Sequence, residues 1–315
     1  MDPSKMIFVV VNPNSANRRT GREWPQISRA LKEAIGDFEA LKTRAPGEAT
    51  RIAREALKSG FQMIVSVGGD GTHNEVVNGF FNLEGGKPVS INPDAVLAVI
   101  TKGTGGDFRK ALKIGKDIGP AIGVLKDGKD RLIDAGMLTL VDHRNEKVTR
   151  LFINIASFGI GGDVDDRVNR QTKILGGKIS FLRGAVVATI LYQNKHVKIS
   201  IDGEKKWEGR VYNAAVANGQ YFGGGMWVAP GAKLDDGLFD IVVMGDMSFG
   251  EILTGGTKIY QGKHLDHPKV QVFRGRVVEA ISEERVLLDV DGEQPGRIPS
   301  VFTLLPQAIR IRMPE

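Results

Sequence analysis

An apolar segment of this chain runs directly into a glycine-rich turn, Val65-Ser66-Val67-Gly68-Gly69-Asp70-Gly71-Thr72-His73-Asn74-Glu75. Residues 63–67 form a short, continuous apolar run, which is typical of a strand covered on both faces of a parallel sheet. The glycines permit positive φ angles and let phosphate oxygens approach the backbone. A helix that follows them offers free N–H groups to an anion. The stretch predicts a phosphate-binding loop, against the alternative of a tight turn in which Thr72 caps the helix.

Two further loops of similar composition follow other predicted strands. Asn12-Pro13-Asn14-Ser15-Ala16 follows the apolar run 6–11, and Lys102-Gly103-Thr104-Gly105-Gly106-Asp107 follows the run 95–100. Each loop alone is also typical of a plain turn or helix cap. Together with the first loop they predict a ligand site, because ligands of parallel α/β sheets collect at the carboxyl edge. Asp70 would repel a phosphate, so either Mg²⁺ or a donor group is expected beside it.

The order of the periodic segments predicts two domains. Up to about residue 130, strand and helix signals alternate, which favours an α/β domain with a doubly wound parallel sheet. Beyond it, short alternating segments dominate, and Asp202-Gly203 predicts a hairpin turn. We therefore expect a nucleotide-binding domain at 1–130 and a β-rich, antiparallel, sandwich-like domain at 131–305. The strand at 306–315 is expected to return to the first domain.

Individual elements are predicted from periodicity within these domains. Besides the three strands that precede the loops, a strand is expected to end at Thr43. Helical segments are expected at 27–35, 52–57, about 74–81, 179–192 and 249–260.

The composition excludes several classes of protein. The 315 residues include 40 glycines and no cysteine, which rules out disulfide scaffolds, thiolate metal sites and cysteine nucleophiles. The formal net charge of +6 permits attraction to anionic lipid or nucleotide. The uncharged run at 184–194 is too short to span a bilayer, so the chain is expected to be cytoplasmic.

Two acidic turns in the second domain are candidates for chemistry. Asp291-Gly292-Glu293 places two acids in one glycine-containing turn, where one could accept a proton. Asp235-Asp236-Gly237 could supply a metal ligand. Both are also compatible with solvated hairpin turns. His264-Asp266-His267 is interpreted as a polar loop, because a third ordered ligand is lacking.

A third candidate surface is basic. Lys173, Lys178 and Arg183 beside the apolar segment 179–192 could hold the protein against anionic lipid, or the segment could be a packing helix.

Taken together, these motifs resemble those of the diacylglycerol kinase catalytic superfamily, in particular the bacterial lipid kinases related to sphingosine and ceramide kinases. The matching segments, in family order over nearly the whole chain, are Asn12-Pro13-Asn14-Ser15, Gly68-Gly69-Asp70-Gly71-Thr72 with Asn74-Glu75-Val76, Gly103-Thr104-Gly105-Gly106-Asp107-Phe108, Asn218 through Gly223-Gly224-Gly225 and Ala229-Pro230-Gly231 to Gly237-Leu238, and Asp291-Gly292-Glu293.

The motifs differ in specificity. NAD kinases share the Gly-Gly-Asp-Gly-Thr loop, whereas the later segments favour the lipid kinases. The chain departs from the family at Ala16, where glycine is usual, and at Gly106, where asparagine is usual. These departures bear on nucleotide affinity and donor preference.

The resemblance implies a role for each matched residue. Glu293 would be the general base, with Asp291 beside it. Asp236 would bind Mg²⁺ through its carboxylate, and Lys233 and Leu238 through their backbone carbonyls. The nucleotide would be bound by Asn12, Pro13, Asn14, Ser15, Ala16, Thr43, Gly69, Asp70, Gly71, Thr72, His73, Asn74, Glu75 and Thr104.

The implied function is an ATP-dependent lipid kinase of the NAD-kinase-like fold, active in lipid metabolism. It would use Mg²⁺ and transfer the γ-phosphate to a hydroxyl of diacylglycerol or a related lipid. The lipid would be presented at a membrane surface, with peripheral membrane association, no nucleic-acid partner, and an oligomeric state left open. Two alternatives remain. One is an NAD kinase, from the shared loop, and the other is a catalytically weakened lipid-binding regulator, from the departures at Ala16 and Gly106.

Overall fold

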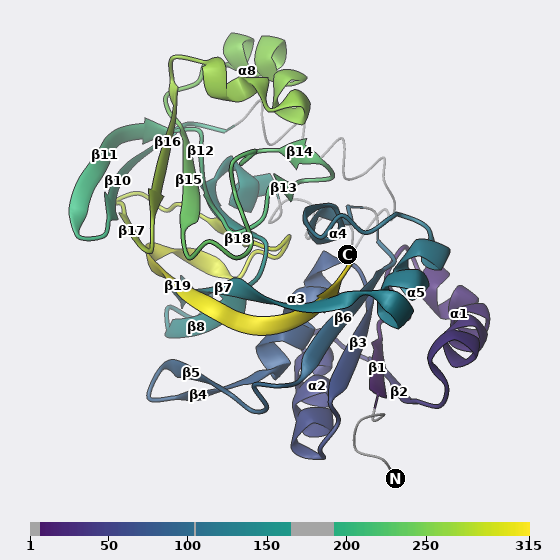
Figure 1. Cartoon of the computed structure of the whole chain (residues 1–315). Helices are drawn as coiled ribbons and strands as arrows, with labels where there is room; N and C mark the ends of the chain where they lie inside the picture. The colour runs from purple at the N-terminus through teal and green to yellow at the C-terminus, as the bar shows by residue number, and fades with distance from the viewer. Residues whose placement is uncertain (1–6, 104, 165–191) are drawn as a thin grey trace. The chain divides into compact units, whose positions relative to one another are not determined.

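The computed structural model describes residues 7–103, 105–164 and 192–315. The chain divides into two compact units, Met1–Ala135 with Leu305–Glu315, and Gly136–Leu304. Strands β7 (Lys129–Asp142) and β19 (Gly296–Met313) each contribute residues to both units. Figure 1 shows the α/β architecture of unit 1 and the β-rich architecture of unit 2, as the sequence predicts.

Unit 1 is built on a parallel sheet. Its strands, in spatial order, are β2 (Glu39–Lys42), β1 (Ile7–Val11), β3 (Met63–Gly68), β6 (Val96–Thr101) and the C-terminal part of β19. Each neighbouring pair is parallel. Val9 lies opposite Val65, and Val65 lies opposite Ala98, so these apolar runs form the buried centre of the sheet. This arrangement follows from the continuous apolar runs, since a parallel sheet is covered on both faces.

Helices cover both faces of this sheet. On one side α1 (Arg19–Ile35) contacts α5 (Ile118–Asp127), and on the other α2 (Glu48–Lys58) contacts α3 (Asp70–Gly79), as Figure 1 shows. Helix α2 buries an apolar stripe that includes Ile52, Ala53, Ala56 and Leu57, at the spacing expected for an amphipathic helix. Helix α3, expected over about 74–81, begins at Asp70, so the end of the glycine motif forms its first turn.

Shorter elements complete unit 1. They are the helix α4 (Asp107–Ala111) and the hairpin of β4 (Phe81–Glu84) and β5 (Lys87–Ser90).

Unit 2 contains two packed layers of antiparallel strands. The first has the order β16 (Val270–Gly275), β15 (Phe239–Met244), β12 (Asn213–Ala217), β9 (Ile155–Gly159) and β18 (Leu288–Val290). The second has the order β11 (Glu204–Val211), β10 (Lys195–Ile201), β17 (Val277–Ile281) and the N-terminal part of β19, with β7 and β8 (Lys147–Phe152) beside it. One buried apolar cluster takes residues from both layers, including Ile199, Phe239 and Phe302. The predicted sandwich-like domain is confirmed.

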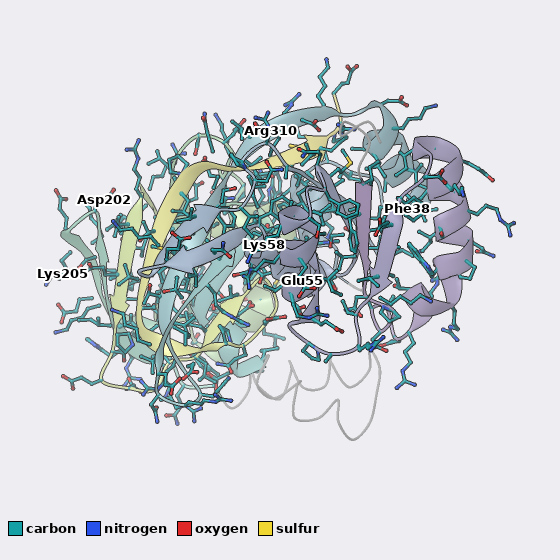
Figure 2. The ribbon with its side chains drawn as sticks, turned by 90° about the horizontal axis from the view of Figure 1, so that it is seen from below. Phe38, Glu55, Lys58, Asp202, Lys205 and Arg310 are labelled. Carbon is teal, nitrogen blue, oxygen red and sulfur yellow. The ribbon has the colours of Figure 1, made fainter. Side chains whose placement is uncertain are left out.

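Two further predictions concern smaller elements of unit 2, the hairpin turn at 202–203 and the helix over 249–260. Asp202, which Figure 2 labels, and Gly203 have φ of 51° and 83° and connect β10 to β11 as the predicted hairpin turn. The helix expected over 249–260 is divided into α8 (Phe249–Gly255) and the short 3₁₀ turn η2 (Lys258–Gln261), and a second 3₁₀ turn, η3 (Lys263–Asp266), follows. A small ribbon joins β13 (Tyr221–Phe222) to β14 (Met226–Trp227).

The sequence also predicts a helix over 179–192 with basic residues near it, which could lie against anionic lipid. Most of the helix expected over 179–192, with Lys173, Lys178 and Arg183, lies outside the described residues. Within the described part of the chain, no helix has the length and apolar character needed to cross a membrane.

Candidate active site

The three predicted loops of unit 1 lie together at the carboxyl edge of the parallel sheet. The side-chain amide of Asn12 donates a hydrogen bond of 2.9 Å to Thr72 Oγ1, which joins the loops after β1 and β3. The loops after β3 and β6 touch through their backbones, since a Cβ on Gly103 would lie 3.0 Å from the Cα of Gly69. Glycine at position 103 therefore allows an approach that a side chain there would hinder.

Asp70 connects the loop after β3 to helix α4. Its carboxylate accepts hydrogen bonds from the backbone N–H groups of Gly106 (2.9 Å), Asp107 (3.1 Å) and Phe108 (3.2 Å). These N–H groups belong to the N-cap and first residues of helix α4, where a negative charge is favourable. The sequence left open whether Mg²⁺ or a donor group accompanies Asp70. The structure supplies three backbone donors.

The loop after β1 is held by its own polar groups. Asn12 Oδ1 accepts from the backbone N–H of Asn14 at 3.0 Å, and the Ser15 hydroxyl donates to the Asn12 carbonyl at 3.0 Å. The next residue, Ala16, has a φ of 52°, in the left-handed region that costs a non-glycine residue about 1–2 kcal/mol. Gly106 also has a left-handed φ, of 66°. Ala16 and Gly106, the two departures from the family pattern, thus both have left-handed backbone, which glycine adopts without strain.

Several predicted nucleotide ligands hold the unit together through their side chains. The carboxylate of Glu75 accepts from the backbone N–H groups of Gly47 at 2.8 Å and Ala49 at 3.0 Å, so it caps the start of α2. Thr43 is buried and its N–H donates to the carbonyl of Val11 at 2.8 Å. The side chain of Asn74 is buried within α3. Thr104 lies outside the described residues.

The side chain of His73 is fully buried and packs against strands β3 and β6 of unit 1. Its Nδ1 is 2.7 Å from the Ser66 hydroxyl, and its Nε2 is 3.1 Å from the Thr101 hydroxyl. Burial lowers the pKa of His73 from 6.5 to about 3, so the imidazole is neutral in the folded protein. A side chain in this place cannot face a bound nucleotide, and any contribution of His73 to the loop comes from its backbone.

The burial of His73 predicts an acid-sensitive unit 1. Below pH 6.5 the unfolded chain binds a proton at this residue and the folded chain does not, so stability falls as pH decreases towards 3. Between pH 7 and pH 5 we expect His73 to contribute a loss of about 2 kcal/mol to the free energy of unfolding. The measurement is urea unfolding at both pH values in a Trp207→Phe, Trp227→Phe background, so that the fluorescence reports Trp24 in unit 1 alone.

Two variants separate this contribution from that of other groups. His73→Gln is expected to reduce the loss between the two pH values, whereas the same change at the exposed His143 should leave it as in the parent. An equal pH dependence in the parent and His73→Gln would contradict the assignment.

Lys102 and Glu23 form an ion pair that the sequence motifs did not indicate. Lys102 Nζ lies 2.5 Å from Glu23 Oε2 and connects the loop after β6 to helix α1. The hydrogen bond from Lys102 holds the pKa of Glu23 below its usual value. Because Glu23 lies in a helix far from Lys102 in sequence, only the folded chain could show this pair.

In unit 2, the two acids of the Asp291-Gly292-Glu293 turn have different surroundings. The buried Asp291 carboxylate accepts hydrogen bonds from the backbone N–H groups of Ile153 (3.0 Å), Asn154 (3.2 Å) and Ile155 (2.9 Å). Asp291 has a φ of 50° and Gly292 of 86°, as in a tight turn that closes on Glu293. Asp291 therefore anchors the turn to the segment that enters β9.

Glu293 is the accessible carboxylate of this turn. Its side chain is 34% exposed and its Oε2 lies 3.3 Å from Arg150 Nη1. The backbone N–H of Gly292, one residue earlier, donates to Asp289 at 2.9 Å and helps to define the turn. Arg150 was not indicated by any sequence motif, because it comes from β8, far from Glu293 in the chain.

Among the predicted magnesium ligands, Asp236 already has a cationic partner. The Asp236 carboxylate pairs with the Arg274 guanidinium, which also donates to Asp240 at 2.8 Å. The other Asp236 oxygen accepts from the backbone N–H of Leu238 at 3.2 Å. Within the part of the chain that the structure describes, no group of three His, Asp or Glu side chains could hold a metal.

The binding of Mg²⁺ by Lys233, Asp236 and Leu238 stays a prediction, and in this structure Arg274 shares the Asp236 carboxylate that would bind the ion. The guanidinium already neutralises the one carboxylate that the ion would use, and Mg²⁺ prefers oxygen ligands in near-octahedral geometry. Burial raises the pKa of the neighbouring Asp240, which Arg274 opposes. Arg274 is the cation that the structure places between these acids.

The diacylglycerol kinase of Staphylococcus epidermidis is 30% identical over 314 residues, covering 99% of this chain and 93% of that protein. The model of the diacylglycerol kinase catalytic domain matches residues 6–138, and that of the YegS C-terminal NAD kinase beta sandwich-like domain matches residues 154–313. The chain belongs to the diacylglycerol kinase catalytic-domain family. The family and the kinase class predicted from sequence are confirmed.

Other relatives agree with this membership. The diacylglycerol kinase of Bacillus subtilis is 29% identical over 313 residues, covering 99% of this chain and 97% of that protein. Among solved structures, a diacylglycerol kinase from Bacillus anthracis superposes with a TM-score of 0.70 at 22% identity, over 98% of this chain and 97% of that one. An NAD kinase from Archaeoglobus fulgidus in complex with ATP has a TM-score of 0.50 at 15% identity, covering 98% of this chain and 94% of that one. These two structures show the shared fold.

Proposed function

We propose that this family member is a lipid kinase that transfers the γ-phosphate of ATP to a hydroxyl group of diacylglycerol or a closely related lipid. The observation that carries the proposal is the junction of three loops, two of them glycine-rich, at one sheet edge, tied by Asp70 and by the Asn12–Thr72 hydrogen bond. The names of the relatives, diacylglycerol kinase over nearly the full length, support the lipid acceptor.

We assign the binding of ATP to the loops of unit 1. At Gly69 a Cβ would meet no atom closer than 3.8 Å, so this backbone is open to a phosphate oxygen, and the start of α3 favours an anion. The proposed ligands remain Asn12 to Ala16, Thr43, Gly69 to Glu75 and Thr104. Where their side chains are engaged within the unit, as at His73 and Glu75, the contact would come from the backbone. ATP would be used as its magnesium complex, in which the ion neutralises charge on the β- and γ-phosphates.

We assign the acceptance of the proton to Glu293. As the lipid hydroxyl oxygen bonds to the γ-phosphorus, the bond from phosphorus to the β–γ bridging oxygen breaks and ADP leaves. The hydroxyl proton passes to the Glu293 carboxylate. Asp291 does not take this role, because three backbone N–H groups occupy its carboxylate. Arg150 beside Glu293 would orient its carboxylate.

The test is a phosphorylation assay with γ-labelled ATP, MgCl₂ and mixed micelles that contain dioleoylglycerol, sphingosine or ceramide, with NAD as a separate acceptor. We expect labelled phosphatidic acid, identified by mass spectrometry. Labelled NADP without labelled lipid would overturn the proposal in favour of an NAD kinase. Absence of transfer to every acceptor would favour the catalytically weakened regulator.

A further inference from the structure

An excursion of the chain projects from one end of the five-stranded sheet of unit 2. Strands β15 and β16 pair in register from Phe239–Gly275 to Met244–Val270, so a short turn could close this hairpin. Instead residues 245–269 leave the sheet and form α8, η2 and η3 (Figure 1). Ordering such an excursion costs conformational entropy, so its fixed structure calls for a physical cause.

Part of the cause is a set of inward contacts. Met247, Ile259 and Leu265 pack against a buried apolar cluster of unit 2. His264 is buried and its Nε2 donates to the carbonyl of Val228 at 3.0 Å. These contacts attach the two 3₁₀ turns and the entry to α8, but none of them involves a residue of α8 itself.

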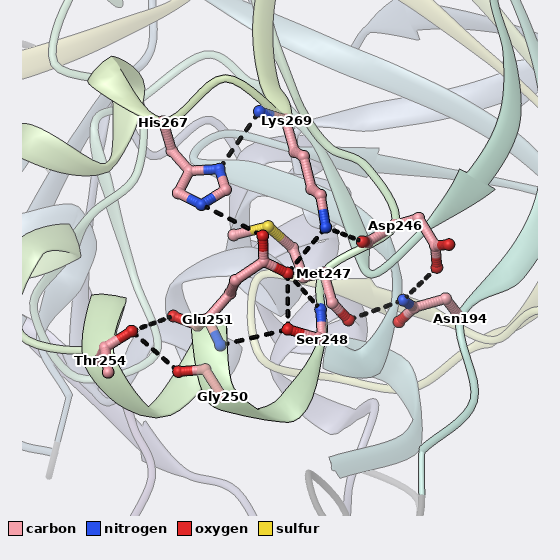
Figure 3. A network of polar contacts seen from close by, with 9 residues as sticks. All are labelled: Asn194, Asp246, Met247, Ser248, Gly250, Glu251, Thr254, His267 and Lys269. Atoms are coloured by element: carbon pink, nitrogen blue, oxygen red, sulfur yellow. Dashed lines mark hydrogen bonds and ion pairs between the residues drawn. The ribbon is translucent and has the colours of Figure 1, made fainter.

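Helix α8 is held instead by polar groups, shown in Figure 3. Ser248 and Glu251 form a capping box, with the Ser248 N–H donating to Glu251 Oε2 at 2.7 Å. Lys269 Nζ lies 2.8 Å from the same carboxylate and donates to the Asp246 carbonyl at 2.9 Å. The hydrogen bonds from Lys269 and Ser248 lower the pKa of Glu251 to about 2, so this carboxylate stays charged. Asn194 adds a bond of 2.8 Å to the Met247 carbonyl.

The excursion also presents apolar side chains to solvent. Helix α8 buries none of its residues. Phe249 is 51% exposed, Leu253 72% and Tyr260 55%, and Leu253 is the most exposed large apolar side chain among the described residues. Lys258 and Lys263 are exposed beside them. We call these five residues the α8 surface.

The chemistry of the α8 surface matches a lipid interface. Aromatic and aliphatic side chains next to lysines are typical of segments that lie in the headgroup region, where the rings enter the acyl boundary and the ammonium groups meet anionic headgroups. The net charge of +6 adds long-range attraction to an anionic membrane. Because hydrogen bonds and ion pairs hold α8 in place, its apolar side chains can face solvent without packing into a core. We propose that the α8 surface docks this protein on an anionic bilayer, an inference that rests on the proposed function, because a diacylglycerol acceptor resides there.

The test is co-sedimentation of the full chain with vesicles of phosphatidylcholine and phosphatidylglycerol, without ATP. Leu253→Glu should weaken binding by about tenfold, because it removes an inserted apolar side chain and adds a repelled charge. The matched control is Leu83→Glu in unit 1, where the leucine is 48% exposed and outside the α8 surface. Its binding should equal that of the parent. Tyr260→Ser is a second variant with no added charge, and it should also weaken binding.

The proposal is overturned if Leu253→Glu and Leu83→Glu bind vesicles equally. It is also overturned if Leu253→Glu changes the mass in sedimentation velocity and not vesicle binding, since the surface would then bind a second copy. Activity separates this inference from the proposed function. Leu253→Glu should phosphorylate dioleoylglycerol in vesicles about tenfold more slowly but water-soluble dihexanoylglycerol at the parent rate. If no variant phosphorylates lipid while the binding difference persists, the proposed function fails and the docking surface stands.

Discussion

Replacing Glu293 with glutamine is expected to lower kcat for lipid phosphorylation by about 10²- to 10⁴-fold, the contribution typical of a general base. Glutamine keeps the size of the side chain but cannot accept the proton of the attacking hydroxyl. The change should leave the fold intact, because Glu293 is partly exposed and its ion pair with Arg150 lies at the surface, where such pairs contribute little. The measurement is the initial rate of phosphatidic acid formation, together with the melting temperature.

Glu279→Gln is the matched control, since it makes the same chemical change at an exposed position of β17 in the same unit. Its kcat should equal that of the parent. A Glu293→Gln enzyme that retains more than a tenth of the parent kcat, with an unchanged melting temperature, would remove Glu293 from the role of base.

Replacing Asp291 with asparagine is expected to destabilise unit 2 by about 2–4 kcal/mol. The buried carboxylate accepts three backbone hydrogen bonds from residues 153–155, and an amide offers one oxygen to the same three donors while turning its NH₂ group towards an N–H. Asparagine tolerates the left-handed φ of 50° at this position, so the change isolates the lost acceptor from backbone strain.

Urea unfolding measures this effect in a Trp24→Phe background, where Trp207 and Trp227 report on unit 2 alone. The control is Asp235→Asn, an exposed acid of the same unit, which should change the free energy of unfolding by less than about 0.5 kcal/mol. If Asp291→Asn is as stable as the parent and has lost its activity, Asp291 acts in the chemistry and not as the anchor of the turn.

Together, Glu293→Gln and Asp291→Asn distinguish the roles of two acids that the sequence motif does not separate. Asp291 and Glu293 stand two residues apart in one motif, and both carry a carboxylate. What separates them is the segment 153–155, which comes from a distant part of the chain and surrounds Asp291 with donors. No local pattern around residue 291 contains that information.

The same contrast holds in the phosphate-loop region of unit 1. The sequence predicts the strand over 63–67 and the presence of a helix after it, because continuous apolar runs and glycines are local signals, but the helix begins at Asp70 and not at about residue 74. It does not predict that Glu75 caps α2, nor that Ser66 of β3 and Thr101 of β6 are the partners of His73. Most of those partners are distant in sequence, and a polar residue near a phosphate loop looks the same whether it faces a ligand or the core.

By itself, the sequence determined the fold class of both units, the family, and the meeting of three loops, two of them glycine-rich, at one sheet edge. Hydrophobic periodicity sets which faces must be buried, and the carboxyl ends of parallel strands necessarily share one edge. The tertiary structure decided the role of each polar side chain. It gave Asp70 the N–H groups of α4, Asp291 those of 153–155, and Asp236 the guanidinium of Arg274. A carboxylate acts according to its neighbours, and folding alone brings those neighbours to it.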